Sequence, residues 1–404
     1  MSNHPKTVVV IGGGAAGFFF AVNCAERNPH YRIIILEKSG KLLDKVRISG
    51  GGRCNVTHAC YEPAALAERY PRGKRELLGA FHRFQPRDTV QWYADREVEL
   101  KTEDDGRMFP STDSSETIAQ CLLTRAAQHG IVVRTHCEAD TLNYKDGQWH
   151  ITTAQDEALQ AHILYIATGS ALRMWTMLER MGYTIVPPVP SLFTFHIKDE
   201  LIKGLQGIAV ENATVRIADA KLTEAGPVLI THWGLSGPAI LRLSAWGAVA
   251  LHERQYRFQL QVNWTGTLNI PQTTAHLKQY KQDNPKRNIL KHPLFKLPSR
   301  LWERLCISAQ ITVPTWAEIT NKEIEALAQV LSHTLLQVSG KSTFKDEFVT
   351  CGGVALHQVD FKTFASKLHP HLYLGGEVLN IDAITGGFNF QAAWTGAWLA
   401  AQAV

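Results

Sequence analysis

The sequence predicts an α/β protein with a Rossmann-like dinucleotide-binding domain. Residues 7–11 form a continuous apolar run of strand length that ends in glycines, and a helix of small residues is expected from there to about residue 27. A second apolar run, residues 33–36, ends at Glu37. An unbroken apolar strand is typical of a parallel sheet that helices cover on both faces. The β-α-β order therefore indicates a covered parallel sheet at the start of the chain.

The segments that follow alternate between helical and strand-like periodicity. A helix is expected over residues 115–130, and strands are expected near 131–135, 147–153 and 162–167. Prolines at 187, 188 and 190 indicate a domain boundary. Beyond them we expect short strands at 192–197, 213–217, 227–231 and 256–262, a helical pattern from 271 to about 338, and a final helix over 389–403. A β-rich module and a helical module therefore interrupt the nucleotide-binding unit.

Gly12, Gly14 and Gly17 follow the first strand in the spacing GxGxxG and open the first helix. Such a fingerprint permits a tight turn, the approach of a pyrophosphate to the backbone, and close packing of the helix on the strand. Glu37, 20 residues beyond Gly17, stands where a carboxylate accepts hydrogen bonds from the adenosine ribose. This acid also disfavours a 2′-phosphate, so NADP is not expected at this site.

The fingerprint alone does not distinguish FAD from NAD, but four further glycine clusters favour FAD. They lie at residues 49–55, 167–169, 375–377 and 385–387. A long cofactor with two heads needs several close approaches of the backbone, although each cluster taken singly is also compatible with an ordinary turn. No second GxGxxG follows a strand, so a nicotinamide nucleotide is expected to bind only transiently.

Five longer stretches resemble the HI0933-like (YhiN/BaiN-type) family of FAD-dependent, or NAD(P)/FAD-dependent, oxidoreductases. They are residues 45–57 (KVRISGGGRCNVT), 106–110 (GRMFP), 231–238 (THWGLSGP), 351–354 (CGGV), and 375–382 (GGEVLNID) with 385–391 (TGGFNFQ). The resemblance implies FAD, bound by a Rossmann-like domain of the glutathione-reductase type that a β-barrel-like insert and a small helical insert interrupt. Family members have been assigned as amine oxidases or as reductases of conjugated ketones such as bile-acid intermediates, and most have no established substrate.

On this basis we expect three domains and an extended FAD site. The FAD-binding domain is expected at residues 1–190 and 346–404, the β-rich insert at 191–265 and 338–345, and the helical insert at 266–337. The expected FAD-binding residues are Gly12, Gly14, Ala15, Ala16, Gly17, Glu37, Lys38, Lys45, Ser49, Gly50, Gly51, Gly52, Arg53, Cys54, Asn55, Ala139, Ala167, Thr168, Gly169, Gly376, Glu377, Asp382, Gly387, Phe388, Asn389 and Phe390.

Two features depart from related patterns. After residues 167–169 many family members carry a further glycine-rich segment, whereas this chain reads SALRMWTM at residues 170–177, a stretch expected near the flavin or the substrate entrance. Cys54 and Cys60 are one residue further apart than the redox pair of disulfide reductases, and the family pattern carries only the first cysteine. We therefore expect packing and backbone roles for both.

The catalytic residues stay open, with Arg53, His232 and Trp233 as candidates. Arg53 offers charge to a phosphate or to the N1–C2=O region of the reduced flavin, or else forms a surface ion pair. His232 and Trp233 lie in a glycine-punctuated loop directly after an expected strand. Ligand sites favour domain interfaces, so the inserts are expected to supply a substrate wall that includes this loop.

Three polar residues of the C-terminal glycine-rich turns have more than one possible role. Asn389 either bonds the flavin or fixes its loop, while Glu377 and Asp382 are expected to accept bonds from ribityl hydroxyls or backbone amides. The seventeen histidines show no HExxH or comparable spacing. No metal site is therefore expected.

Composition excludes several classes of protein. Apolar residues make up 45% and charged residues 20%, which excludes a disordered chain. The net charge of +5 is modest, and the nearest basic run, residues 278–291, is interpreted as a solvated helical face. No signal peptide is visible, and the uncharged residues 8–22 are too few to span a membrane. Seven cysteines without a CxxC pair argue against a zinc site and a secreted disulfide framework, so a cytoplasmic protein with reduced thiols is expected.

The leading hypothesis is an FAD-dependent oxidoreductase. It would transfer a hydride between flavin N5 and a small organic substrate, an amine or a conjugated ketone, with NAD(P)H, a quinone or O₂ as the second substrate. Two alternatives stay open: an FAD-dependent RNA-modifying protein and a non-catalytic flavin-binding protein. Nucleic acid is the less favoured partner, because RNA binding would require a basic stripe with aromatic platforms on the inserts, and the sequence shows none clearly.

Overall fold

The computed structural model describes residues 5–342 and 349–404. The chain forms two compact units: unit 1 comprises Met1–Val189 with Lys345–Val404, and unit 2 comprises Pro190–Phe344. Among the described residues, no helix is long and apolar enough to cross a membrane.

Unit 1 is built on a seven-stranded sheet in the order β19-β20-β21-β10-β1-β2-β6. Five of these strands are parallel: β1 (Thr7–Ile11), β2 (Arg32–Leu36), β6 (Val132–Arg134), β10 (Ile163–Ile166) and β21 (Leu372–Leu374). Two short antiparallel strands, β20 (Ala365–Ser366) and β19 (Val359–Asp360), complete the edge. Strands β1 and β10 have almost no exposed surface along their apolar residues, because the sheet is covered on both faces. The predicted Rossmann-like fold is confirmed.

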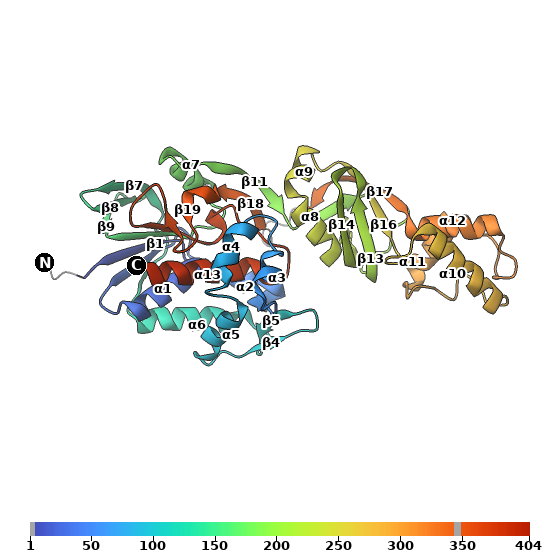
Figure 1. Ribbon diagram of the computed structural model, residues 1–404, viewed down its shortest axis with the longest axis horizontal. Coiled ribbons are helices and arrows are strands. Elements are labelled where there is room, and N and C mark those ends of the chain that lie inside the picture. Colours follow the sequence, from blue (N-terminus) through green and yellow to red (C-terminus); the bar gives the residue numbers. More distant parts are fainter. Residues whose placement is uncertain (1–4, 343–348) are drawn as a thin grey trace. The chain divides into compact units, whose positions relative to one another are not determined.

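The first and last helices of the chain pack against each other beside this sheet (Figure 1). They are α1 (Ala15–Arg27) and α13 (Phe388–Ala403), and α6 (Ser115–Gln128) also contacts α1. Between ring centroids, Phe19 on α1 lies 4.4 Å from Trp92 and 5.0 Å from Trp394 on α13. Burial of such large rings contributes strongly to core stability. The C-terminal segment is therefore an integral part of the nucleotide-binding fold.

The remaining elements of unit 1 are short. The helices are α2 (Asp44–Gly52), α3 (Pro63–Ala67), α4 (Lys74–Phe81), α5 (Pro86–Ala94) and α7 (Leu172–Arg180). One small sheet contains β3 (Thr57–His58), β5 (Arg107–Pro110) and β4 (Leu100–Thr102), and another contains β7 (Ala139–Lys145), β8 (Gln148–Thr153) and β9 (Ala158–Ala161). Strands β11 (Ile185–Ser191) and β18 (Val349–Val354) form a two-stranded sheet.

Unit 2 contains a closed antiparallel barrel and a helical part. The barrel order is β12 (Thr194–Ile197), β15 (Gly234–Ser236), β14 (Leu222–Ile230), β13 (Ala209–Ile217), β16 (Phe258–Asn263) and β17 (Thr334–Ser342). Helices α8 (Pro238–Trp246) and α9 (Ala248–Glu253) follow β15 in the chain. The helical part comprises α10 (Ile270–Asp283), α11 (Ser299–Ser308) and α12 (Asn321–Ser332). The predicted barrel-like insert is thus confirmed as a closed six-stranded barrel.

The expected helical pattern up to about residue 338 is wrong at its end. Helix α12 ends at Ser332, and Thr334 already pairs with Val262 in the barrel. Leu335, which falls within the expected helical pattern, is an outward-facing strand residue with 46% of its surface exposed. Residues 334–337, which were expected in the helical insert, therefore lie in a barrel strand. Residues 343–345 of the expected β-rich insert and residues 346–348 of the expected FAD-binding domain lie outside the described residues. The division into three domains stays a prediction.

Candidate cofactor site

Two fingerprint glycines are required by close packing of the backbone. Gly12 has a φ of +112°, and a Cβ there would lie 2.4 Å from the carbonyl oxygen of Ala167 on the neighbouring segment. A Cβ on Gly17 would lie 2.0 Å from the carbonyl oxygen of Gly12. Both distances are far below van der Waals contact, so only glycine lets β1, β10 and α1 meet in this way.

Gly14 has a different reason to be glycine. Its backbone is extended, with φ −95° and ψ −168°, and a Cβ there would have no atom within 4 Å. Neither packing nor conformation therefore demands glycine. The space lies in front of the N-terminus of α1, whose first N–H groups have no partner within the helix and attract an anion. Gly51 and Gly52 show the same open space, although their φ values of +68° and +83° also favour glycine.

Glu37 lies at the end of β2, beside the fingerprint. Its Oε2 accepts a hydrogen bond from the Gly13 N–H at 2.9 Å, and its Oε1 accepts from the Ser39 N–H at 2.8 Å and the Ser39 hydroxyl at 2.9 Å. These three bonds hold the carboxylate in the lining of a pocket and leave about one acceptor position available, since an ionised carboxylate accepts about four hydrogen bonds. The carboxylate is thus fixed where ribose hydroxyls are expected.

The pocket beside Glu37 collects residues from four distant segments. Its walls are Ile11, Gly12, Leu36, Glu37, Lys38, Cys137, Glu138, Ala139, Thr168, Ala171, Arg173 and Met174. It lies outside the carboxyl ends of the parallel strands, where open α/β sheets bind nucleotides. Residues 171–174 belong to the divergent stretch that was expected near the flavin or the substrate entrance. A place for this stretch near the flavin or the substrate entrance stays a prediction, while its residues Ala171, Arg173 and Met174 line the Glu37 pocket.

Thr168 contributes an unsatisfied polar group to the same pocket. Its Oγ1 is buried and has no hydrogen-bond partner among the described residues. Buried hydroxyls are rarely left unpaired, since an unmade hydrogen bond costs about 1–3 kcal/mol. A ligand hydroxyl or phosphate oxygen in the pocket would satisfy it.

A second, smaller pocket lies near the start of α13. It is lined by Phe364, Gly376, Glu377, Leu379, Ile381, Asn389 and Ala392. The Glu377 carboxylate forms an ion pair with Lys45, so two expected cofactor residues from opposite ends of the sequence meet here. Gly376 has a φ of +73°, and a Cβ on it would lie 3.2 Å from the Cβ of Ala16 on α1.

Hydrogen bonds tie the expected flavin-side segments together. The Asn55 amide donates to the Thr57 carbonyl at 3.1 Å and accepts from the Gly387 N–H at 2.9 Å in the orientation that satisfies both groups. The Thr57 hydroxyl donates to Gln391 Oε1 at 2.6 Å, and the Thr89 hydroxyl donates to the same oxygen at 2.9 Å. All of these groups are buried or nearly so. The loop at residues 50–57 and the N-terminus of α13 therefore form one rigid wall.

Several expected cofactor residues use their polar atoms within the protein. Asn389 accepts from the Ala383 N–H at 2.9 Å and donates to the Ala383 carbonyl at 3.2 Å, which is the loop-fixing role. The fully buried Asp382 carboxylate pairs with Arg72, and no spacing pattern along the chain predicts this partner. Within the protein, the polar atoms of Asn389 and Asp382 therefore have structural roles.

Arg53 also has partners within the protein. Its guanidinium donates to Glu103 at 2.6 Å and lies 4.0 Å from the centroid of the Phe109 ring. The hydrogen bond that Arg53 donates to Glu103 raises the pKa of Arg53 above its ordinary value. These contacts correspond to the surface ion pair, one of the two roles expected for Arg53. A role of Arg53 toward phosphate or flavin stays a prediction.

The other expected residues of this wall surround the same turn. Phe388 is buried, and its ring stacks on His58 with centroids 4.6 Å apart, while Phe390 stacks on Trp394 at 5.6 Å. His58, which sequence reasoning missed, has a buried Nδ1 without a partner among the described residues, and burial lowers its pKa. His58 directly follows the family motif that ends at Thr57, and this position could have indicated it as a residue of the site.

The cysteines of this region are free thiols. Cys54 is fully buried, and burial raises its pKa to about 12, so the thiol carries no appreciable charge at neutral pH. Cys60 is partly exposed and is also unpaired with sulfur. The expected packing role of Cys54 agrees with this environment. The absence of a redox role stays a prediction, which thiol chemistry can test. Among residues 5–342 and 349–404, no group of three or more His, Cys, Asp or Glu side chains is arranged to hold a metal.

The candidates His232 and Trp233 belong to unit 2. They lie in the tight turn between β14 and β15, where the Thr231 N–H donates to the Gly234 carbonyl at 2.8 Å. Both residues are exposed, and the Trp233 ring lies 5.5 Å from the ring of His196. A Cβ on Gly234 would lie 2.3 Å from the Phe195 carbonyl, which explains the glycine of this turn. A substrate role for the turn stays a prediction.

The residues present fit FAD, which requires a long cradle with anion-binding and hydroxyl-binding parts. The open space at Gly14 faces a helix N-terminus, the Glu37 pocket suits adenosine, and Thr168 offers an unsatisfied hydroxyl. We expect the wall formed by residues 50–57 and α13 to present backbone to the rest of the cofactor. The individual contacts remain predictions.

Comparisons with known proteins agree with this description. A ribosomal RNA dihydrouridine synthase from Escherichia coli (strain K12) is 26% identical, and the match covers 98% of this chain and 96% of the relative. A second, from Haemophilus influenzae, is 25% identical, and the match covers 100% of this chain and 99% of the relative. The 3-dehydro-bile acid delta(4,6)-reductase of Clostridium scindens is 23% identical over 98% of both chains.

Solved structures show the same fold. The 3-ketosteroid delta1-dehydrogenase of Sterolibacterium denitrificans has a TM-score of 0.52 and 10% identity over 99% of both chains. The 3-ketosteroid-delta4-(5alpha)-dehydrogenase of Rhodococcus jostii has a TM-score of 0.51 and 11% identity over 99% of this chain and 98% of its own. The model of the HI0933-like protein Rossmann domain matches residues 6–403. With this match over nearly its whole length, the chain belongs to the HI0933-like family of FAD-dependent oxidoreductases.

Proposed function

We propose that the protein uses FAD to reduce a carbon–carbon double bond conjugated to a carbonyl group. The observation that carries this proposal is the chemistry shared by the relatives' names. A dihydrouridine synthase saturates the double bond next to a carbonyl of uracil, and a delta(4,6)-reductase of a 3-dehydro-bile acid saturates double bonds conjugated to a ketone. In both reactions each saturated double bond takes up one hydride and one proton.

The site supports direct transfer between flavin and substrate. A flavin accepts and delivers hydride at N5 and so supplies the redox chemistry. A dithiol relay is not favoured, because the fully buried Cys54 has a pKa of about 12 and would be a poor nucleophile. NAD(P)H is the proposed electron donor and binds transiently, since the sequence has no second dinucleotide fingerprint.

The chain's own residues would bind and orient the cofactor. The N–H groups at the start of α1 would hold the pyrophosphate, and Glu37 would accept the ribose hydroxyls. The N-terminus of α13 would present N–H groups, and a helix N-terminus stabilises nearby negative charge by about 0.3–1 kcal/mol. The Asn55 bond to Gly387 keeps these groups in place.

Among possible substrates we favour a uridine within ribosomal RNA. The two ribosomal RNA dihydrouridine synthases match at least 98% of the chain. The distribution of charge also supports a polyanionic substrate: residues 190–344 contain 17 Lys and Arg against 11 Asp and Glu, a net +6, while the rest of the chain carries −1. A small conjugated ketone is the second candidate, which the bile-acid reductase supports.

Anaerobic half-reactions test the proposal. The oxidised holoenzyme is mixed with NADH or NADPH, and bleaching of the flavin band measures its reduction. The reduced enzyme is then mixed with protein-free ribosomal RNA that lacks dihydrouridine or with a cyclic enone. In a separate experiment the oxidised enzyme is mixed with an aliphatic amine.

Reoxidation by the RNA, together with dihydrouridine detected in the RNA digest by mass spectrometry, is the expected result. Reoxidation by the enone alone would move the substrate to the second candidate. Failure of both acceptors, or reduction of the oxidised flavin by the amine, would refute the proposed reaction.

A further inference from the structure

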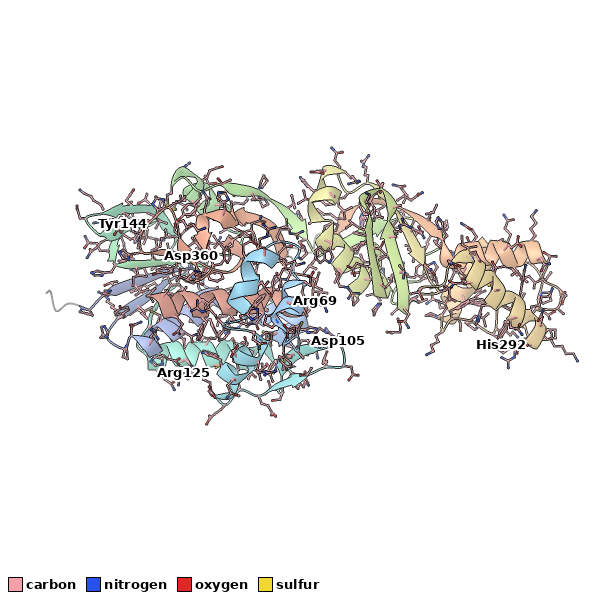
Figure 2. All side chains as sticks on the ribbon, in the orientation of Figure 1. Arg69, Asp105, Arg125, Tyr144, His292 and Asp360 are labelled. Carbon is pink, nitrogen blue, oxygen red and sulfur yellow. The ribbon has the colours of Figure 1, made fainter. Side chains whose placement is uncertain are left out.

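The connection between α10 and α11 in unit 2 is strongly basic. Residues 284–298 contain Lys286, Arg287, Lys291 and Lys296 and no Asp or Glu. All four residues are exposed. Figure 2 shows the His292 side chain of the same connection on the outside of the helical part, away from the barrel strands. We call these four residues the basic connection.

Neighbouring cations have partners, whereas the basic connection lacks acidic ones. Lys278 lies 3.8 Å from Glu325, and Arg304 donates to the carbonyl of Glu200 at 2.9 Å. By contrast, no ion pair joins the basic connection to a carboxylate anywhere in residues 5–342 and 349–404. Four positive charges therefore face solvent without internal compensation, which is the electrostatic arrangement of a polyanion-binding surface.

The connection is held in a defined shape by buried groups and backbone bonds. Ile289 is fully buried, its N–H donates to the Pro314 carbonyl at 2.9 Å, and its carbonyl accepts from Trp302 Nε1 at 2.8 Å. The Arg287 carbonyl accepts from the Trp316 N–H at 3.1 Å. The backbone that carries the cations is therefore ordered before any ligand binds, which lowers the entropy cost of binding.

An aromatic pair lies beside the cations. The ring of Phe295, within the connection, is 4.9 Å from the ring of the exposed His276 on α10. Phe295 and Lys296 also have left-handed backbone conformations, with φ of +56° and +55°. Aromatic rings next to a basic surface are the usual platform on which unpaired bases stack. This is the combination of charge and rings that the sequence alone did not reveal.

We propose that the basic connection binds the sugar-phosphate backbone of the RNA that contains the uridine substrate. This inference rests on the proposed function and adds to it a surface in the helical part of unit 2. An anionic membrane is the less suitable partner, because membrane-surface binding needs an amphipathic helix with a large apolar face, and the basic connection is not helical. The phosphate contacts would supply affinity and orientation, while the site in unit 1 would select the base.

Charge removal in the full-length holoenzyme tests this surface. The test variant replaces all four residues of the basic connection by glutamine. The matched control removes four exposed cations of the barrel in the same way and consists of Lys198→Gln, Arg216→Gln, Lys221→Gln and Arg257→Gln. Binding of a fluorescein-labelled RNA hairpin with a uridine-rich loop is measured by anisotropy between about 50 and 200 mM salt, the range over which phosphate contacts change affinity strongly.

We expect the test variant to bind RNA at least about tenfold more weakly at low salt. The slope of log affinity against log salt should become shallower by about 3, since each neutralised phosphate of a single strand contributes about 0.7. The control should bind like the parent. Reduction by NAD(P)H and reoxidation by a cyclic enone should be unchanged in all three proteins.

Three outcomes would overturn the inference. They are parent-like RNA binding by the test variant, equal losses in the test variant and the control, and parent binding to phosphatidylglycerol vesicles but not to RNA. Failure of the proposed function has a different signature, because the parent would then leave every conjugated double bond unreduced whatever its affinity for RNA. The two failures are therefore separate results.

Discussion

Replacing Gly14 by valine tests the cofactor cradle with little disturbance of the fold. The backbone at Gly14 is extended, a conformation that β-branched residues adopt readily, and a Cβ would meet no atom within 4 Å. Glycine is a better N-cap than valine, so we expect the free energy of unfolding of the apoprotein to fall by no more than about 1 kcal/mol. The side chain would occupy the space where the pyrophosphate approaches α1. We expect FAD affinity to fall at least about a hundredfold, or about 2.8 kcal/mol.

Gly12→Ala is the matched contrast. Its φ of +112° and the 2.4 Å approach of a Cβ to the Ala167 carbonyl require the backbone to move. We expect a loss of about 2–4 kcal/mol in the free energy of unfolding, from strain and overpacking together. At about 2–4 °C per kcal/mol for a domain of this size, the melting temperature should fall by about 5–15 °C.

Two measurements separate these effects. FAD content after purification and FAD titration of the deflavinated protein report the cradle, and thermal unfolding of the deflavinated protein reports the fold. We expect Gly14→Val to be stable but colourless and Gly12→Ala to be unstable. Normal FAD affinity in Gly14→Val, or instability equal to that of Gly12→Ala, would refute it.

Four further predictions concern other parts of the molecule. Alkylation of the native protein at pH 8 should leave Cys54 unmodified, because burial raises its pKa to about 12; a Cys54 disulfide that NAD(P)H reduces through the flavin would contradict this. Gln391→Leu should lower the free energy of unfolding by about 2–4 kcal/mol in urea titrations, since it leaves two buried threonine hydroxyls without their acceptor. Burial raises the pKa of Glu26, but hydrogen bonds from two arginines outweigh burial and lower the pKa. The ionised carboxylate therefore stabilises the fold fully above the ordinary pKa of 4.5, and this stabilisation is lost as the pH falls through the lowered pKa. In Glu26→Gln, the free energy of unfolding should depend less on pH in that range. His232→Ala and Trp233→Ala should keep normal FAD content and change flavin reduction or reoxidation rates, and loss of FAD in both would place the substrate site elsewhere.

The sequence by itself determined the nucleotide-binding core, because its signals are local. An apolar strand, a GxGxxG turn and a terminal acid lie within residues 7–37, and their spacing predicts the order of β1, α1 and β2. The same local patterns predicted α6, most barrel strands and the C-terminal helix. They failed at residues 334–338, where the helical spacing of apolar residues continued into a strand. Barrel pairing with β16 overrides local propensity there, since its hydrogen bonds join residues far apart in the sequence.

Only the tertiary structure decided which residues of the site work together. Glycine at position 14 is free of steric demand while glycine at 12 is not, a difference that depends on the distant Ala167 carbonyl. The partner of Asp382 is Arg72, and the bond between Asn55 and Gly387 joins segments more than three hundred residues apart. The basic connection is likewise visible only in the structure, where Lys278 lies 3.8 Å from Glu325 while no carboxylate among the described residues pairs with the four cations of the connection. Pairing, burial and open space are properties of contacts between distant segments, which composition and spacing along one chain do not specify.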